Sequence, residues 1–507
     1  MTTFRQSAAL TSAVAALLLT GCRVGPKYQV PPAMAQAPPV AYKEAPAPNS
    51  DAWKVAQPQD AMLHGKWWEI YNDPELNALE DQLNINNQNI KQFFENFMEA
   101  RTLIAQARAQ LYPTVGTSPG YTRAGTSANT VNNSGTTSAT TGQNLTTNLT
   151  TLPIDVSWEP DLWGKVRNTI HEQQYAAQLS AADLENERLT EQADLAITFF
   201  EIRGQDALEA LYDQTIAADK KALDYTQAQY DTGVGDRISV VEAQNTLQNA
   251  QAAATNLGVA RAQFEHAVAV LIGTNASGFS IPVRALDAAP PAIPIGLPSQ
   301  LLERRPDVAA AERSMASANA QIGVAYAAFY PTLTLSATGG LESSSWKHLF
   351  DIASRYWSVG PSVSETIFDA GLRRAQVNQF VFTYNADVAS YRQTVLTAFQ
   401  QVEDYLAATR ILSTQIQQQQ LAEQSAKEYL DLEMARYTTG IDPYVDVVTA
   451  QTTLLTDQQT LTTLHTNVMT SSVQLIEALG GGWDRTQLPT PEQVSKKLTK
   501  DETTIQK

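Results

Sequence analysis

Long stretches of this chain carry hydrophobic residues at the three- and four-residue spacing of a helix. The region 171–229 contains no proline and a single glycine, Gly204, which predicts one helix of roughly 90 Å. From Val377 onward the spacing is a heptad pattern sustained over about five heptads, which is typical of a coiled coil. One hydrophobic position of the heptad holds Val381, Val388, Val395 and Val402. The other holds Val377, Tyr384, Tyr391, Ala398, Tyr405 and Leu412. Helices of this length predict a tube or a stalk.

Four shorter segments alternate hydrophobic and polar residues with the period of a β-strand. The clearest runs through Leu152, Ile154 and Val156. A wet face and an apolar face suit the wall of a membrane barrel, and they equally suit a half-buried soluble sheet. Four strands cannot close a barrel, which needs about eight, so a barrel requires several copies of the chain. The strands are expected at about 112–126, 149–160, 331–342 and 355–368.

The two halves of the chain repeat one design. The segment from Tyr230 to Gln244 matches the segment from Tyr437 to Gln451 at a constant offset of 437 − 230 = 207. A Tyr-Pro-Thr sequence recurs as well, at an offset of 330 − 112 = 218. Gly233 and Gly440 are suited to end helices, so each copy predicts a helix–turn–helix tip. A repeat this long indicates two large units side by side.

The first residues predict an export signal. Arg5 precedes an apolar core at 8–19, and Leu19-Thr20-Gly21-Cys22 resembles a bacterial lipobox, in which the cysteine is lipidated. The alternative is an ordinary signal peptide that ends near an unrelated cysteine. Cys22 is the only cysteine, so no disulfide can form within the chain. The expected organisation is a removed signal (1–21), a lipid-anchored tether (22–60), a first repeat (61–272), a Pro-rich linker (273–298), a second repeat (299–483) and a polar tail (484–507).

Composition and charge exclude several classes of function. The formal net charge is −17 with no basic block, which argues against binding of nucleic acid. The five histidines are scattered, and no nucleophile, metal or phosphate motif is present. The sequence therefore predicts neither an enzyme nor a cofactor, apart from the covalent lipid on Cys22.

Several motifs in order resemble one family. They are Trp67-Trp68 with Asp73-Pro74-Glu75-Leu76, the segment from Ser157 to Arg167 (SWEPDLWGKVR), the segment from Leu297 to Glu312 (LPSQLLERRPDVAAAE), and the segment from Phe368 to Ala375 (FDAGLRRA). They resemble the outer-membrane efflux lipoproteins of the TolC superfamily, in its NodT/OprM branch.

This resemblance implies a mainly α fold with membrane β. A homotrimer would form a long antiparallel coiled-coil α-barrel through the periplasm and a β-barrel in the outer membrane, with four strands from each protomer and 273–298 in an equatorial belt. The resemblance also implies a passive exit duct for drugs or other small toxic compounds. Its partners would be a periplasmic adaptor and an inner-membrane pump of the RND type.

The resemblance also assigns residues to the two tips. A gate at the periplasmic end would use Asp446 and Thr449, which lie one helical turn apart on one face. The simpler interpretation of Asp446 is a solvated carboxylate early in a helix, where the helix dipole favours it. Further gate candidates are Val445, Ser239 and Arg237, and the expected adaptor contacts are Gly233, Val234, Gly235, Gly440 and Ile441.

Two other functions remain open from the sequence. One is the outer-membrane channel of a type I protein secretion system, although the lipobox and the Arg304-Arg305-Pro306-Asp307 motif favour the efflux branch. The other is a non-conducting structural envelope lipoprotein. Such a protein would need the helices but not strands with a polar face.

Overall fold

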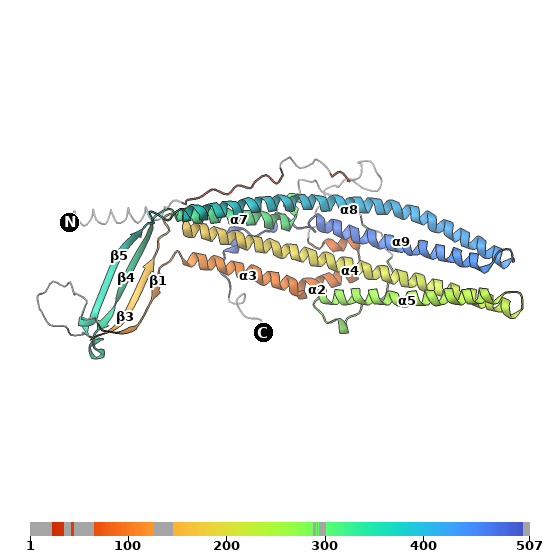
Figure 1. Cartoon of the computed structure of the whole chain (residues 1–507), viewed down its shortest axis with the longest axis horizontal. Coiled ribbons are helices and arrows are strands. Elements are labelled where there is room, and N and C mark those ends of the chain that lie inside the picture. Colours follow the sequence, from red (N-terminus) through yellow and green to blue (C-terminus); the bar gives the residue numbers. More distant parts are fainter. Residues whose placement is uncertain are drawn as a thin grey trace.

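The fold is elongated, with a small sheet at one end of a long layer of helices (Figure 1). The computed structural model describes residues 23–34, 42–44, 65–125, 146–286, 290–291, 293 and 301–499. Cys22, the predicted signal and most of the predicted tether lie outside the described residues, as does most of the loop before the second strand. No helix within the described part is long and apolar enough to cross a membrane.

Two very long helices form the framework. α4 (Lys165–Asp231) and α8 (Leu372–Thr438) each have 67 residues, which corresponds to about 100 Å of helix. α3 (Gln88–Ala109) and α5 (Arg237–Leu271) contact α4, while α7 (Pro306–Ala327) and α9 (Tyr444–Ala478) contact both α4 and α8. In Figure 1, α3 and α5 follow one another along α4, and α7 and α9 follow one another along α8. The predicted long helices are confirmed.

Helix lengths reveal the duplication directly. The first half contains helices of 22, 67 and 35 residues (α3, α4 and α5), and the second half contains helices of the same three lengths (α7, α8 and α9). In each half the strands come between the shortest helix and the longest. The sequence repeat therefore corresponds to two copies of one structural unit.

The sheet is antiparallel and uses four strand positions. β3 (Thr146–Trp158) pairs with β4 (Thr332–Ser343), β4 pairs with β5 (Arg355–Ser364), and the other side of β3 pairs with β1 (Thr114–Gly116) and then β2 (Gly120–Gly125).

Two predicted strands differ from the observed ones. The segment predicted at about 112–126 is interrupted between β1 and β2 at Pro119, which has no N–H to donate to the ladder. β5 ends at Ser364, before the predicted end near residue 368. A turn follows it, in which Asp369 accepts a hydrogen bond from the backbone N–H of Gly371 at 2.9 Å.

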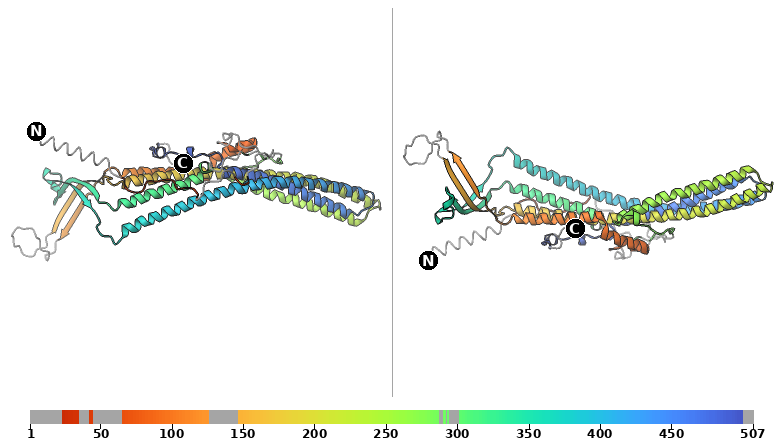
Figure 2. Two further views of the ribbon diagram at one scale, coloured as in Figure 1. Left: turned by 90° about the horizontal axis from the view of Figure 1, so that it is seen from above. Right: turned by 90° about the horizontal axis from the view of Figure 1, so that it is seen from below.

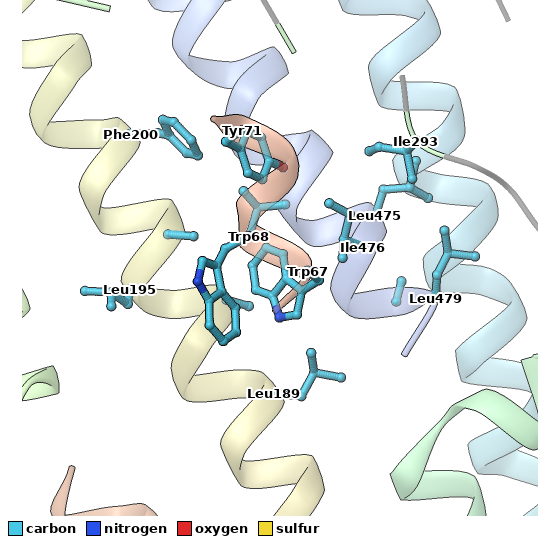
Figure 3. Close-up of a cluster of buried hydrophobic side chains, with 14 of the residues drawn as sticks. Trp67, Trp68, Tyr71, Leu189, Leu195, Phe200, Ile293, Leu475, Ile476 and Leu479 are labelled. Atoms are coloured by element: carbon cyan, nitrogen blue, oxygen red, sulfur yellow. The ribbon is translucent and has the colours of Figure 1, made fainter. Parts of the chain in front are cut away.

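The main hydrophobic core lies midway along the helices. η2 (Trp67–Tyr71) inserts Trp67 and Trp68 between α4 and α9, against Leu195, Leu475 and Ile476 (Figure 3). Most heptad residues of α8 point inward, and Val395, Ala398 and Val402 have no exposed surface. The remaining short elements are α2 (Pro74–Asn86), η3 (Ala276–Gly278), α6 (Leu301–Arg304), η5 (Trp346–His348), η6 (Ile352–Ser354), η7 (Arg485–Gln487) and α10 (Pro491–Val494).

Two terminal segments lie along the helices, and neither contains more than single turns of helix. Residues 23–34, here called the N-terminal strap, follow α7, where the Tyr28 hydroxyl donates to Glu312 Oε1 at 2.6 Å. The C-terminal segment from 484 to 499 contacts α3 and α4, and it buries Val494 against Ile104 and Ala177. Figure 2 shows α2 and this C-terminal segment on the same side of the long helices.

Candidate gate and docking tips

The two helix–turn–helix tips have the same backbone geometry. Gly233 and Gly440 have φ angles of +77° and +76°, a left-handed conformation that L side chains rarely adopt. After each glycine the next amide donates back into the preceding helix, Val234 to the Gln229 carbonyl and Ile441 to the Arg436 carbonyl, both at 3.0 Å. These bonds close the helix ends, so both glycines are needed for the turns.

Both tips lie at the end of the molecule farthest from the strands (Figure 1). The predicted adaptor-contact residues are accessible there, and the side chains of Val234 and Ile441 are 80% and 65% exposed. Gly235 is half-buried against the end of α4. Exposed apolar side chains on a tight turn can insert into a partner surface.

Aromatic residues join the two tips. Tyr444, the first residue of α9, is buried against Ala222 of α4 and Ala243 of α5. Tyr437 near the end of α8 donates a hydrogen bond through its hydroxyl to Gln229 Oε1 at 2.6 Å. Burial raises the pKa of Tyr444 to about 12, so its hydroxyl stays neutral at physiological pH. Any separation of the tips must break the packing of Tyr444 and the hydrogen bond between Tyr437 and Gln229.

Asp446 belongs to a group of acidic side chains. One carboxylate oxygen each from Glu433, Asp442 and Asp446 lies within 4.8 Å of the others, a spacing that could hold a metal ion. Arg436 forms an ion pair with Asp442 that lowers the pKa of that carboxyl. Burial, followed by the proximity of Asp442, raises the pKa of Glu433. The group concentrates negative charge at the start of α9.

Sequence analysis missed two members of this group, Glu433 and Asp442, together with the cation Arg436 that pairs with Asp442. Comparison of the two repeats could have found them. With the offset of 207, the matching residues of the first tip are Thr226 (433 − 207), Gln229 (436 − 207) and Gly235 (442 − 207). None of these is charged, so the acidic group has no counterpart at the matching positions of the first tip.

The other predicted gate residues are divided between the tips. Val445 and Thr449 lie on the first turns of α9, and the Thr449 hydroxyl donates to the Val445 carbonyl at 2.9 Å. Arg237 and Ser239 begin α5, where the Ser239 amide donates to Asp236 at 2.8 Å. The tertiary structure therefore places Asp446 among acidic partners, whereas the Thr449 hydroxyl is already bonded within its own helix.

Known proteins show the same sequence family and the same fold. A family described as outer membrane efflux protein matches residues 79–274 and 297–481. The probable efflux pump outer membrane protein TtgC of Pseudomonas putida is 31% identical over 477 residues, which cover 94% of this chain and 95% of that protein. The outer membrane protein OprJ of Pseudomonas aeruginosa is 29% identical, with 92% and 95% covered.

Solved structures agree with these matches. The outer-membrane channel OprN superposes with a TM-score of 0.80 at 25% identity, over 91% of this chain and 100% of that chain. The CmeC outer membrane channel of Campylobacter jejuni has the same fold, with a TM-score of 0.81 at 22% identity over 95% and 100% of the two chains. The fold and its tips thus define an outer-membrane channel. The chain belongs to the outer membrane efflux protein family and is the outer-membrane component of an efflux pump.

Proposed function

We propose that this channel is the passive exit duct of a tripartite pump. It receives drugs or other small toxic compounds from an inner-membrane RND-type transporter through a periplasmic adaptor. The carrying observation is the sheet, which ends in two unpaired edges, one formed by β1 and β2 and the other by β5. An open edge strand presents backbone N–H and C=O groups that can pair with a strand of another chain. Three copies pairing edge to edge supply twelve strand positions, enough to close a barrel.

The tips supply the regulated end of this duct. In a trimer, three copies of the acidic group around Asp446 would surround one axis, and within each protomer Arg436 offsets one of the three negative charges through its ion pair with Asp442. The adaptor would contact the exposed turns at Val234 and Ile441. Docking there can separate the tips by breaking the bond between Tyr437 and Gln229.

The N-terminal strap supports a lipid anchor at Cys22. The Arg23 Nε donates to Asn168 Oδ1 at 2.5 Å, and the Val24 amide donates to the Trp163 carbonyl at 3.1 Å. Both partners lie at the junction between β3 and α4. Arg23 and Val24 are therefore held next to the sheet, so an acyl chain on the preceding cysteine would reach the same membrane as the strands.

Replacement of this cysteine by Cys22→Ala should abolish acylation. Labelling with radioactive palmitate should disappear, because the variant lacks the only cysteine of the chain. Less protein should remain in the membrane, because several acyl chains hold a protein far more stably than none. The sheet should keep a fraction of the protein in the membrane. The measurement is metabolic labelling followed by membrane fractionation, with Ser7→Ala in the signal region as the control. Undiminished labelling of Cys22→Ala would exclude this residue as the acceptor.

The function is tested by removing the gene and restoring it. Cells that lack the chain should retain more ethidium and become more sensitive to antibiotics, and the wild-type chain should reverse both effects. The measurement is dye retention together with inhibitory concentrations. Unchanged retention combined with loss of a secreted protein from the medium would instead favour a type I secretion channel.

A further inference from the structure

A polar cavity lies in the middle of the helical layer, away from the tips. Its volume is about 320 Å³, near the lower limit for sites that hold small molecules. It occurs where α9 ends and α7 begins, so two helix ends leave a gap between α4 and α8. The residues that matter for its chemistry are Thr190, Arg305, Gln401, Tyr405, Gln474 and Glu477.

On one side, the three helices around this cavity are covered by η2 and by residues 42–44. Three hydrogen bonds show which residues of the helices lie on that side. On α4, Gln192 accepts a hydrogen bond from the Trp67 indole at 3.2 Å. On α9, Ser472 bonds to the Tyr71 hydroxyl at 2.8 Å. On α8, Glu403 accepts a hydrogen bond from a backbone amide of the 42–44 segment at 2.8 Å. These contacts define the outer side of the layer.

The cavity faces the opposite side. On each of the three helices a lining residue is two positions from the outward residue, namely Thr190 on α4, Gln474 on α9 and Gln401 on α8. Two positions rotate a side chain by about 200° around a helix. These three side chains therefore point away from η2, toward the side that would be the interior of the duct in the proposed trimer, while the core residue Leu189 closes the cavity on the other side.

The only cation in its lining is already neutralised. Arg305 donates to both oxygens of Asp307, at 2.9 and 2.6 Å, and also to Gln401 Oε1 and the Ala478 carbonyl. Glu477 by contrast forms no ion pair among the described residues, although Arg305 lines the same cavity. Its nearest hydrogen-bond donor is the Thr190 hydroxyl, at 3.5 Å. The free charge in the cavity is thus a carboxylate.

We propose that this cavity binds a small organic ammonium ion, with Glu477 as its counter-ion and the Tyr405 ring and the Gln474 amide as neutral contacts. A carboxylate attracts the cation, an aromatic face interacts favourably with it, and amide oxygens accept its N–H groups. The inference rests on the proposed function in one respect. If three copies of the chain form a duct, three such sites line it. It adds a class of transported compound, namely amines that are positively charged at neutral pH.

The charges around Glu477 predict how binding depends on pH. Burial, followed by the negative charge of Asp194 on α4, raises its pKa to about 7, and Arg305 opposes the shift. Asp307 on α7 and Tyr405 on α8 are the other titratable groups facing Glu477. A cation needs the ionised carboxylate. Binding should therefore be nearly full at pH 8, about half as strong near pH 7, and largely lost at pH 6.

The test uses the purified full-length protein in detergent, titrated with benzylamine by saturation-transfer NMR at pH 8. We expect saturable binding, no saturable binding of the neutral analogue benzyl alcohol, and at least tenfold weaker benzylamine binding by Glu477→Gln. The control Glu428→Gln removes an exposed carboxylate of α8 outside the cavity and should bind like the wild type. A fall in wild-type binding from pH 8 to pH 6 is an independent requirement that involves no variant.

Equal binding by Glu477→Gln and the wild type, or binding that does not weaken at pH 6, would overturn the proposal. Potassium conductance of the same preparation in planar bilayers separates this question from the duct itself. A protein that conducts without binding benzylamine refutes the site and leaves the duct intact. A protein that binds benzylamine but conducts neither as the wild type nor as Asp446→Ala, which removes the proposed gate charge, retains the site and refutes the duct.

Discussion

Replacement of Arg203 by alanine should destabilise the protein by about 2–3 kcal/mol, because it removes the charge-assisted hydrogen bonds of a buried guanidinium, while Asp206 keeps its second partner Arg261. Arg203 is 1% exposed in the middle of α4. Its guanidinium donates to Asp206 Oδ2 at 3.1 Å and to the Pro282 carbonyl at 2.7 Å, and it forms an ion pair with Glu75 of α2. One side chain thus holds the linker and α2 against the long helix.

A matched control lies on the same helix. Arg188 pairs with Glu185 at 3.0 Å with the same three-residue spacing, but the two side chains are 37% and 30% exposed. Solvent screens such a pair, so Arg188→Ala should change stability by no more than about 1 kcal/mol. The measurement is the free energy of unfolding from denaturant titration followed by circular dichroism. Equal losses in the two variants would show that burial of the Arg203 network contributes nothing.

Replacement of Asp446 by alanine should make the channel leak. Asp442, followed by Glu433 and then Asp446, raises the pKa of Arg436, so the charge of Asp446 helps to hold the start of α9 to the end of α8. Its loss weakens that attraction and removes bulk at the proposed constriction. A shift of about 1.4 kcal/mol in the equilibrium between closed and open states changes the open population tenfold. We therefore expect about tenfold higher mean conductance in planar bilayers.

The control for this prediction is Asp431→Ala, which removes an exposed carboxylate of α8 two residues before Glu433. It should conduct like the wild type and leave cells resistant to large antibiotics. The Asp446→Ala variant should make cells more sensitive to them, because an open duct admits compounds from outside. If the Asp446→Ala variant conducts like the wild type and its cells are no more sensitive, the prediction is wrong. Asp446 is then a solvated carboxylate at a helix start.

Local patterns predicted much of the fold because they reflect local physics. The heptads of α8 mark its buried face, and a region without proline predicted α4. Gly233 and Gly440 predicted where two helices end, since only a glycine readily adopts the backbone that closes them. The duplication was also visible, because a repeated sequence folds into a repeated unit.

The candidate sites depended on contacts that no local pattern specifies. Asp446 was predicted through its family, but Glu433 and Asp442 became its neighbours only when α8 and α9 folded back on each other. The cavity joins Arg305 to Gln401 and Glu477, which are far apart in the sequence.

The sequence by itself thus determined the helices, the strands, the tips and the two-fold repeat, since each arises from spacing within a short segment. Only the tertiary structure decided which charges are buried, which are paired and which remain free. Those properties depend on the distances between side chains of different helices.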